Sequence, residues 1–155
     1  MDDIEIIAPE NLHEKISSLN FNVLIDMAGV DYLGMKHHEG KRFAVIYCLK
    51  NTKSMERRRL KVQVEEGEKI PTLSNVYPIA DWLEREVWDQ FGIVFEGHHN
   101  LKRILNHADF EGHPLRKDYP AKKRQWLSEN DSMIDQLEER LGTLGYRVIE
   151  RGSVE

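Results

Sequence analysis

The chain has 155 residues, 40% hydrophobic and 32% charged, with a formal net charge of −5, and this length and composition predict one domain with room for a hydrophobic core. The acidic balance argues against a nucleic-acid partner or an anionic membrane, because those partners call for a basic face. The sequence lacks a run of about 18 apolar residues that would span a membrane, and its acidic start, Met1–Glu5, differs from a basic signal peptide, so we expect a cytoplasmic protein.

The first half of the chain predicts strands around one short helix. Leu12, Ile16 and Leu19 follow Pro9 at helical spacing, which indicates an amphipathic helix at 9–19. Strands are expected at 4–7, 21–25, 42–49 and 57–64, with a turn at 26–31 and a polar hairpin loop at 34–41.

Cys48 is the only cysteine of the chain. One cysteine cannot form an internal disulfide or supply the four thiolates that an iron–sulfur cluster typically needs. Its place in the apolar run 43–49 indicates a small buried hydrophobe rather than a reactive thiol. In the next strand, 57–64, apolar and basic residues alternate, so we expect a basic side facing solvent.

The second half predicts two helices separated by a long irregular segment. A helix at 78–91 would begin at a proline, which is acceptable there, and would end at Gly92. Residues 93–120 are rich in Gly, His and Pro, and we expect an extended segment with short strands at most. A last helix is expected at 129–141, with a short strand at 146–149.

The order of these elements predicts an α+β fold. We expect a two-layer domain, with a small antiparallel or mixed sheet and helices on one face, followed by an extended C-terminal segment. The first domain would cover 1–120, including a docking segment at 93–120. Residues 121–155 would form a tail with one helix.

The helix at 78–91 carries an unusual density of charged and aromatic residues. With its apolar face centred on Ile79, Glu86 falls among the inward residues. A buried carboxylate needs a cation, and Arg103 and Arg116 are the candidates. We interpret the pair as structural rather than as a proton-transfer site, with a cost of about 3 kcal/mol for Glu86→Ala. Trp88, on the opposite side, is either an exposed interface anchor or covered by residues 93–120.

The seven histidines lack the defined spacing of a zinc site, so we expect no metal. His113 precedes Pro114, which favours an extended conformation, and we expect it to hydrogen-bond to the backbone of a rigid turn. If the following residues are extended, Arg116 and Asp118 share one side, and Lys117 faces the other way. One side could then pair internally while the other meets a partner, and which of the two sides faces the partner stays open.

Three runs of the sequence carry a family resemblance. They are PIADWLEREVWDQFGIVFEGH at 78–98, LKRIL at 101–105 and GHPLRKDYP at 112–120, with a weaker acidic segment, DMAGVDY, at 26–32. With them, the chain resembles the C-type subunit family, or thirty-kilodalton subunit family, of NADH-quinone oxidoreductase, which is respiratory complex I. The resemblance covers about residues 3–120.

The resemblance implies a non-catalytic subunit in the peripheral arm of a proton-translocating NADH:quinone oxidoreductase. Such a subunit would dock against the D-type subunit at the quinone site, near the B-type and I-type iron–sulfur subunits, on the cytoplasmic face of the cell inner membrane. It would bind no cofactor and no metal and have no catalytic residue, since FMN, the iron–sulfur clusters, NADH and quinone belong to other subunits. The expected structural and docking residues are Glu84, Arg85, Glu86, Trp88, Asp89, Arg103, His113, Arg116, Lys117 and Asp118.

The chain departs from the expected family pattern in three places. Trp88 stands where the family commonly has Tyr, and residues 121–155 do not follow the family's tail. We also expect the N-terminus to lack a leading segment that many members carry. Two alternatives remain open. One is the equivalent subunit of a membrane-bound energy-converting hydrogenase or of a ferredoxin- or F420-linked dehydrogenase complex. The other is a free-standing metal-dependent enzyme that uses the histidines.

Overall fold

The computed structural model describes residues 4–122 and 128–146. The chain divides into two compact units, Met1–Lys122 and Lys123–Glu155, and the first carries the sheet. Most of the expected strand at 146–149 lies outside the described residues. No helix in the described ranges is long and apolar enough to cross a membrane.

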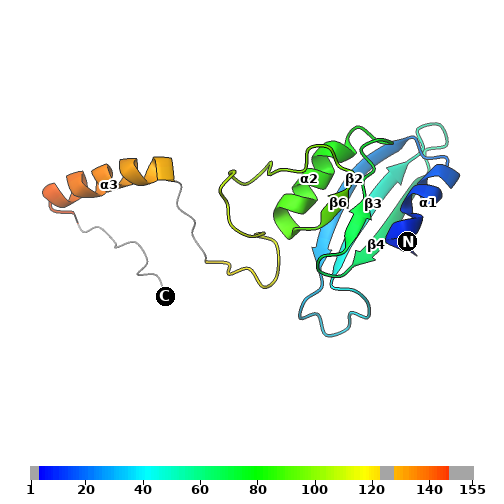
Figure 1. Ribbon diagram of the computed structural model, residues 1–155, viewed down its shortest axis with the longest axis horizontal. Helices are drawn as coiled ribbons and strands as arrows, with labels where there is room; N and C mark the ends of the chain where they lie inside the picture. The colour runs from blue at the N-terminus through cyan, green and yellow to red at the C-terminus, as the bar shows by residue number, and fades with distance from the viewer. Residues whose placement is uncertain (1–3, 123–127, 147–155) are drawn as a thin grey trace. The chain divides into compact units, whose positions relative to one another are not determined.

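A four-stranded mixed sheet forms the centre of the first unit (Figure 1). Its strands follow the order β1-β4-β3-β2; β1 runs parallel to β4, and the other neighbours are antiparallel. Four of the expected strands are therefore present. Their bounds are Ile4–Ile7 for β1, Val23–Asp31 for β2, Phe43–Lys50 for β3 and Arg57–Val64 for β4.

The expected turn at 26–31 is wrong, because β2 continues through it. After an irregularity between Leu24 and Asp26, the strand stays paired with β3 as far as Asp31. Gly29 lies inside this strand because helix α2, Ala80–Phe91, packs closely there: a Cβ at position 29 would lie 2.5 Å from Cδ2 of Phe91. Glycine in a strand often marks such a close approach.

Alternation along the strands separates two faces of the sheet. Leu60, Val62 and Val64 of β4 are buried, while Arg59 and Lys61 point to the other side, which agrees with the expected basic side. The prediction that Cys48 is buried in the core is wrong. It pairs with Arg59 and is half-buried, because it lies on this second face rather than in the core.

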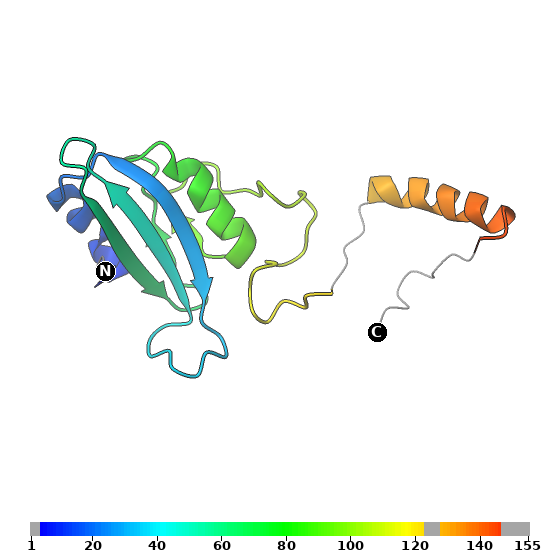
Figure 2. The same cartoon turned by 180° about the vertical axis from the view of Figure 1, so that it is seen from behind.

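The helices cover one face of the sheet, as expected for a two-layer α+β domain. A short 3-10 turn, Pro9–Asn11, leads into α1, Leu12–Ser18, and α2 spans Ala80–Phe91. Figure 2 shows the opposite face of the sheet with no helix in front of it. The core therefore lies between the sheet and these helices, with α2 against β2.

The remaining elements are short or belong to the tail. Strand β5, Lys69–Pro71, pairs in parallel with β6, Val94–Glu96; β5 is too short to show a pattern in the sequence. Residues 97–122 contain turns but no helix or strand. Helix α3 spans Ser128–Thr143, close to the bounds expected from the sequence.

Candidate docking surface

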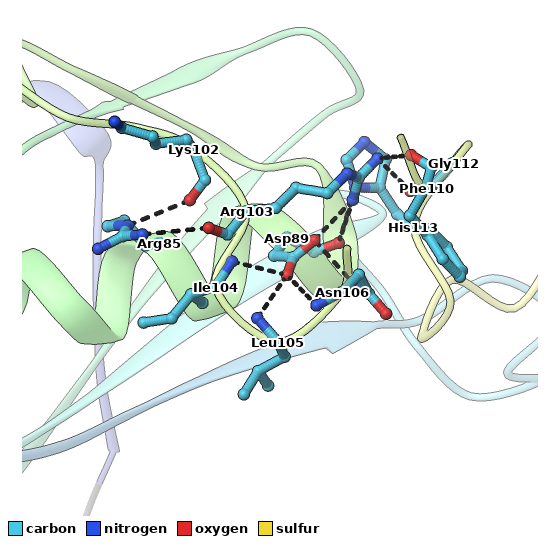
Figure 3. A network of polar contacts seen from close by, with 10 residues as sticks. All are labelled: Arg85, Asp89, Lys102, Arg103, Ile104, Leu105, Asn106, Phe110, Gly112 and His113. Atoms are coloured by element: carbon cyan, nitrogen blue, oxygen red, sulfur yellow. Dashed lines mark hydrogen bonds and ion pairs between the residues drawn. The ribbon is translucent and has the colours of Figure 1, made fainter. Parts of the chain in front are cut away.

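Asp89 of α2 organises the loop that follows the helix (Figure 3). The residue is 0% exposed, and its carboxylate accepts five hydrogen bonds. Oδ1 accepts from Arg103 Nη1 at 2.6 Å and from Asn106 Nδ2 at 3.0 Å. Oδ2 accepts from the backbone N–H groups of Ile104, Leu105 and Asn106 at 3.1, 2.9 and 2.9 Å.

These donors keep Asp89 ionised. Burial by itself would raise the pKa of Asp89, but hydrogen bonds from Asn106, Arg103 and the Ile104 N–H outweigh burial and hold the pKa well below its usual range. The ion pair with Arg103 is largely shielded, with side-chain exposures of 14% for Arg103 and 0% for Asp89. Removing one partner of such a pair leaves a poorly solvated charge, so the pair fixes the loop to the helix.

Two arginines hold the loop in place of regular backbone pairing. Arg103 Nη2 donates to the carbonyl oxygens of Phe110 and Gly112. Arg85, one turn before Asp89 on α2, donates to the carbonyl oxygens of Lys102 and Arg103, both at 3.1 Å. Backbone groups that lack strand partners are thereby satisfied by side chains.

Residues 113–116 cap the C-terminal end of α2. A helix leaves its last carbonyl groups without intrahelical donors. The prediction that His113 bonds to backbone is confirmed, and burial lowers its pKa, so the neutral ring can donate from Nδ1. His113 Nδ1 donates to the carbonyl oxygen of Asp89 at 3.0 Å. Leu115 N donates to that of Gln90 at 3.1 Å, and Arg116 Nε donates to that of Phe91 at 2.6 Å.

Gly92 allows this cap to form. Its φ of +76° is left-handed, a conformation that glycine adopts without strain at the end of a helix. A Cβ there would lie 2.6 Å from the side chains of both Arg116 and His113. The position therefore needs glycine for its conformation and for space.

A second carboxylate, Asp31, ties residues 112–120 to the end of β2. Asp31 is 2% exposed, and Arg42 binds it through two hydrogen bonds of 3.1 and 3.0 Å. Its oxygens also accept from the N–H groups of Leu33 and Lys117 at 3.0 and 2.9 Å. Burial opposes ionisation, but Arg42 and these N–H groups hold the pKa of Asp31 below its ordinary value.

The expected extended geometry of Arg116, Lys117 and Asp118 is wrong. Backbone hydrogen bonds close two successive turns here, so side-chain alternation does not apply. Arg116 and Asp118 do not pair with each other. Arg116 binds Glu66, and Asp118 lies 2.9 Å from Arg42, which joins the segment to the sheet rather than to itself.

Glu84 is the buried carboxylate that connects α2 to the chain after β5. The residue is 0% exposed and accepts from Thr72 Oγ1 at 2.5 Å and from Leu73 N at 2.6 Å. Burial raises the pKa of Glu84 to about 7, and these two hydrogen bonds only partly offset the effect. The buried site therefore disfavours the ionised form of Glu84, and the role of this side chain is to accept the two hydrogen bonds.

The inward position predicted for Glu86 is wrong, because Glu86 is exposed. The expected face was centred on Ile79, but this residue precedes α2 and is 46% exposed. The buried stripe runs through Ala80 and Val87 instead, about a quarter turn away at 100° per residue. Glu84 lies on that stripe, so the inward carboxylate is Glu84 rather than Glu86.

Trp88 is half-buried and packs against the core. The guanidinium carbon of Arg103 lies 5.7 Å from its ring centroid, and the His113 ring meets it edge-on at 6.1 Å. The sequence left two interpretations of Trp88 open, an exposed interface anchor or a ring covered by residues 93–120. The second is correct in part, because Arg103 and His113 cover one portion of the ring. The exposed tryptophan of α2 is Trp82, at 55%.

One group in the described ranges has the residue types of a metal site: ligand atoms of Asp81, His98 and His99 lie within 4.8 Å of one another. The Asn100 N–H donates to His98 Nδ1 at 3.0 Å, so a neutral ring carries its proton on Nε2. That atom lies 3.1 Å from the Asp81 carbonyl oxygen and 3.2 Å from Asp81 Oδ1. These contacts orient His98, whereas the buried Oδ1 atom of Asp81 has no hydrogen-bond partner. The absence of a metal remains a prediction.

The internal pairs leave a defined set of side chains facing outward. Asp31 and Asp89 have their oxygens engaged by donors, so neither is free to take up a substrate proton. We use the term docking surface for six of the exposed residues of α2 and of residues 101–117. They are Trp82, Glu86, Lys102, Leu105, Leu115 and Lys117.

Comparisons with known proteins identify a family for residues 6–125, which match the respiratory-chain NADH dehydrogenase 30 kDa subunit. The chain is 52% identical over 105 residues to a C/D-type subunit of NADH-quinone oxidoreductase from Bdellovibrio bacteriovorus, covering 68% of this chain and 18% of that protein. It is 42% identical over 121 residues to the C-type subunit of Ruegeria pomeroyi, covering 74% of this chain and 58% of that protein. The chain thus spans little more than half of the Ruegeria protein.

Two solved structures are similar to the chain. A trypsin-resistant fragment (1–134) of Nqo5 matches with a TM-score of 0.57 and 37% identity, over 62% of this chain and 80% of that fragment. A chain of the membrane-bound sulfane sulfur reductase, an archaeal respiratory membrane complex, matches with a TM-score of 0.63, over 97% of this chain and 82% of the other. Its identity is 22%, so this second likeness shows the fold alone.

Proposed function

Because the chain belongs to the family of the respiratory-chain NADH dehydrogenase 30 kDa subunit, we propose that it is a non-catalytic subunit of a proton-translocating NADH:quinone oxidoreductase. It docks against the D-type subunit and supports electron transfer from NADH to quinone without carrying electrons itself. The protein lies in the peripheral arm, on the cytoplasmic face of the cell inner membrane, and attaches to the membrane only through the complex.

The fused relative supports the choice of the D-type subunit as the main partner. The name of the Bdellovibrio protein joins the C and D components in one polypeptide. Covalent linkage keeps two modules at a high effective concentration, so such a fusion suits modules that work side by side. In the present chain the same association would depend on a preformed surface.

The geometry supports a docking role rather than a catalytic one. Asp89 and Asp31 each fasten a separate stretch of the irregular segment to the helix or to the sheet. A loop held in this way is ordered before a partner arrives, and preorganisation reduces the cost of association. We propose that Arg85, Asp89, Arg103, His113 and Arg116 maintain this shape, and that Trp82, Lys102 and Lys117 face the partner.

The B-type and I-type iron–sulfur subunits would be further neighbours in the assembled complex. FMN, the iron–sulfur clusters, NADH and quinone would bind to other subunits, and this chain would bind no cofactor. The single cysteine is consistent with this division, since a cluster typically needs four thiolates, and burial raises the pKa of Cys48.

The alternative is the equivalent subunit of an energy-converting hydrogenase or of a ferredoxin- or F420-linked complex. The likeness to the sulfane sulfur reductase carries the fold only, whereas the more similar relatives are named as NADH-quinone oxidoreductase subunits. A neighbouring gene for a flavoprotein NADH module would favour the first function. Nickel-ligand cysteines in the neighbouring large subunit would favour the alternative.

Deletion and complementation of the gene test the proposal. Membranes from the deletion strain should lose quinone-dependent NADH oxidation, and the full-length chain should restore it. The purified chain alone should oxidise no NADH. Unchanged NADH:quinone activity in the deletion strain, or loss of a hydrogen- or ferredoxin-linked activity instead, would contradict the proposal.

A further inference from the structure

A cavity of about 450 Å³ opens beside Trp88 in the loop that Asp89 holds. Its volume lies within the range of small-ligand and side-chain pockets. The aromatic rings of Trp88 and Phe110 line it, together with the aliphatic side chain of Leu101. The other lining residues are Lys102, Arg103, Asn106 and Ala108.

The walls of this pocket are fixed by contacts already described. The guanidinium carbon of Arg103 lies 5.7 Å from the centroid of Trp88 and 5.4 Å from that of Phe110. Because Arg103 is also held by Asp89 at 2.6 Å, both rings are positioned by a buried ion pair. Asn106 donates to the same carboxylate. Four of the lining residues, Lys102, Arg103, Asn106 and Phe110, are drawn in Figure 3.

The charge at the pocket is unbalanced. Arg103 is neutralised by Asp89, but the Lys102 ammonium has no ion-pair or hydrogen-bond partner among the residues that the structure describes, and Lys102 is exposed. The nearby acidic residues Asp109 and Glu111 are not part of the lining. A recess with aromatic and polar walls therefore carries one uncompensated positive charge.

We propose that this pocket receives an apolar or aromatic side chain of a partner polypeptide, with a carboxylate of the same segment pairing with Lys102. Tryptophan and arginine, which both line this pocket, are enriched among the residues that carry most of the binding energy at interfaces. A charge pair at the rim adds orientation and a faster association. The occupant is one extended stretch of a neighbouring subunit, and the inference rests on the proposed function.

Zero-length carbodiimide coupling of the solubilised complex tests the ion pair directly, because it joins an amine and a carboxylate only when they touch. Mass spectrometry should find Lys102 joined to Asp, Glu or a C-terminal carboxylate of another subunit, with a large apolar residue within two positions. Lys53, an exposed lysine of the β3–β4 loop, is the matched control and should remain unlinked. Absence of a Lys102 link in intact complex, or a link to a segment without an apolar neighbour, would overturn the inference.

A charge reversal gives a second, independent readout. Lys102→Glu should weaken binding of the chain to the remaining complex by about tenfold or more, while Lys102→Arg retains it and Lys53→Glu has no effect. The exposed position of Lys102 keeps the fold intact, which thermal unfolding of each variant verifies.

The two proposals fail in different ways. If the wild-type chain is recovered with the complex but Lys102→Glu binds equally well, the pocket is not the contact and the proposed function stands. If the wild-type chain is not recovered with a quinone oxidoreductase at all, the proposed function and this inference both fall.

Discussion

Replacement of Asp89 by alanine should destabilise the domain strongly. The change removes five hydrogen bonds and leaves the guanidinium of Arg103, with 14% side-chain exposure, without its anion. Removing one partner of a buried ion pair costs about 3–5 kcal/mol. The three orphaned N–H groups regain water when the loop loosens, so we expect a loss near the lower end, about 3 kcal/mol.

Urea unfolding of the full-length chain, followed by tryptophan fluorescence, measures this loss. The matched control is Glu86→Ala, which removes an exposed carboxylate from the same helix and should change the free energy of unfolding by less than about 0.5 kcal/mol. Equal losses in the two variants would contradict the role given to Asp89. A loss below about 1 kcal/mol for Asp89→Ala would show that the network does not hold the loop.

Three further changes test other parts of the structure. Since burial raises the pKa of Glu84 to about 7, the free energy of unfolding should fall as pH rises from about 4.5 toward 7. In denaturant unfolding measured across this pH range, Glu84→Gln should remove up to about 3 kcal/mol of that fall. A pH profile equal to that of the wild type would count against the buried position of Glu84. Gly29→Ala places a Cβ 2.5 Å from an aromatic ring and should cost about 1–3 kcal/mol in denaturant unfolding, whereas Gly142→Ala, with open space around it, should cost nothing. Arg42→Gln leaves Asp31 without its cation and should lower the free energy of unfolding by about 3 kcal/mol. The lowered pKa of Asp31 gives stability that is lost as pH falls, so the variant should lose less stability in acid than the wild type does. An equal loss of stability in acid for the two proteins would contradict this.

The fold was largely predictable because its strands alternate and its helices carry apolar periods. Strand 57–64 matches β4 residue for residue, since Leu60, Val62 and Val64 are buried and Lys61 and Gln63 between them are not. The turn expected at 26–31 failed for a tertiary reason. Gly29 indicates a turn locally, but here it admits the ring of Phe91 against the sheet.

The residues of the candidate site were predictable, but not their pairing. Asp89, Arg103 and Arg116 were expected to be structural or docking residues. Asp89 and Arg103 bond to each other, and Arg116 donates to the last carbonyl group of α2; a docking role for them stays a prediction. The prediction that Glu86 is the inward carboxylate was wrong, and Glu84 holds that position instead. The apolar face was centred on Ile79, which lies outside the helix.

Other contacts at the site left no sequence signal. Asp89 lies on the side of α2 away from the buried stripe and is covered only because residues 101–106 fold over it. The link between Asp31 and Lys117 spans 86 positions, and the spacing of a single sequence does not show it.

The most direct test of the docking role is the recovery of the D-type subunit with this chain. A tagged full-length chain would be purified from mildly solubilised membranes of its own cells, and the bound proteins would be quantified by mass spectrometry. We expect the D-type subunit in about equimolar amount, together with the iron–sulfur subunits of an NADH:quinone oxidoreductase. Recovery of the chain alone, or with a large subunit that carries nickel-ligand cysteines, would show that the docking role is wrong.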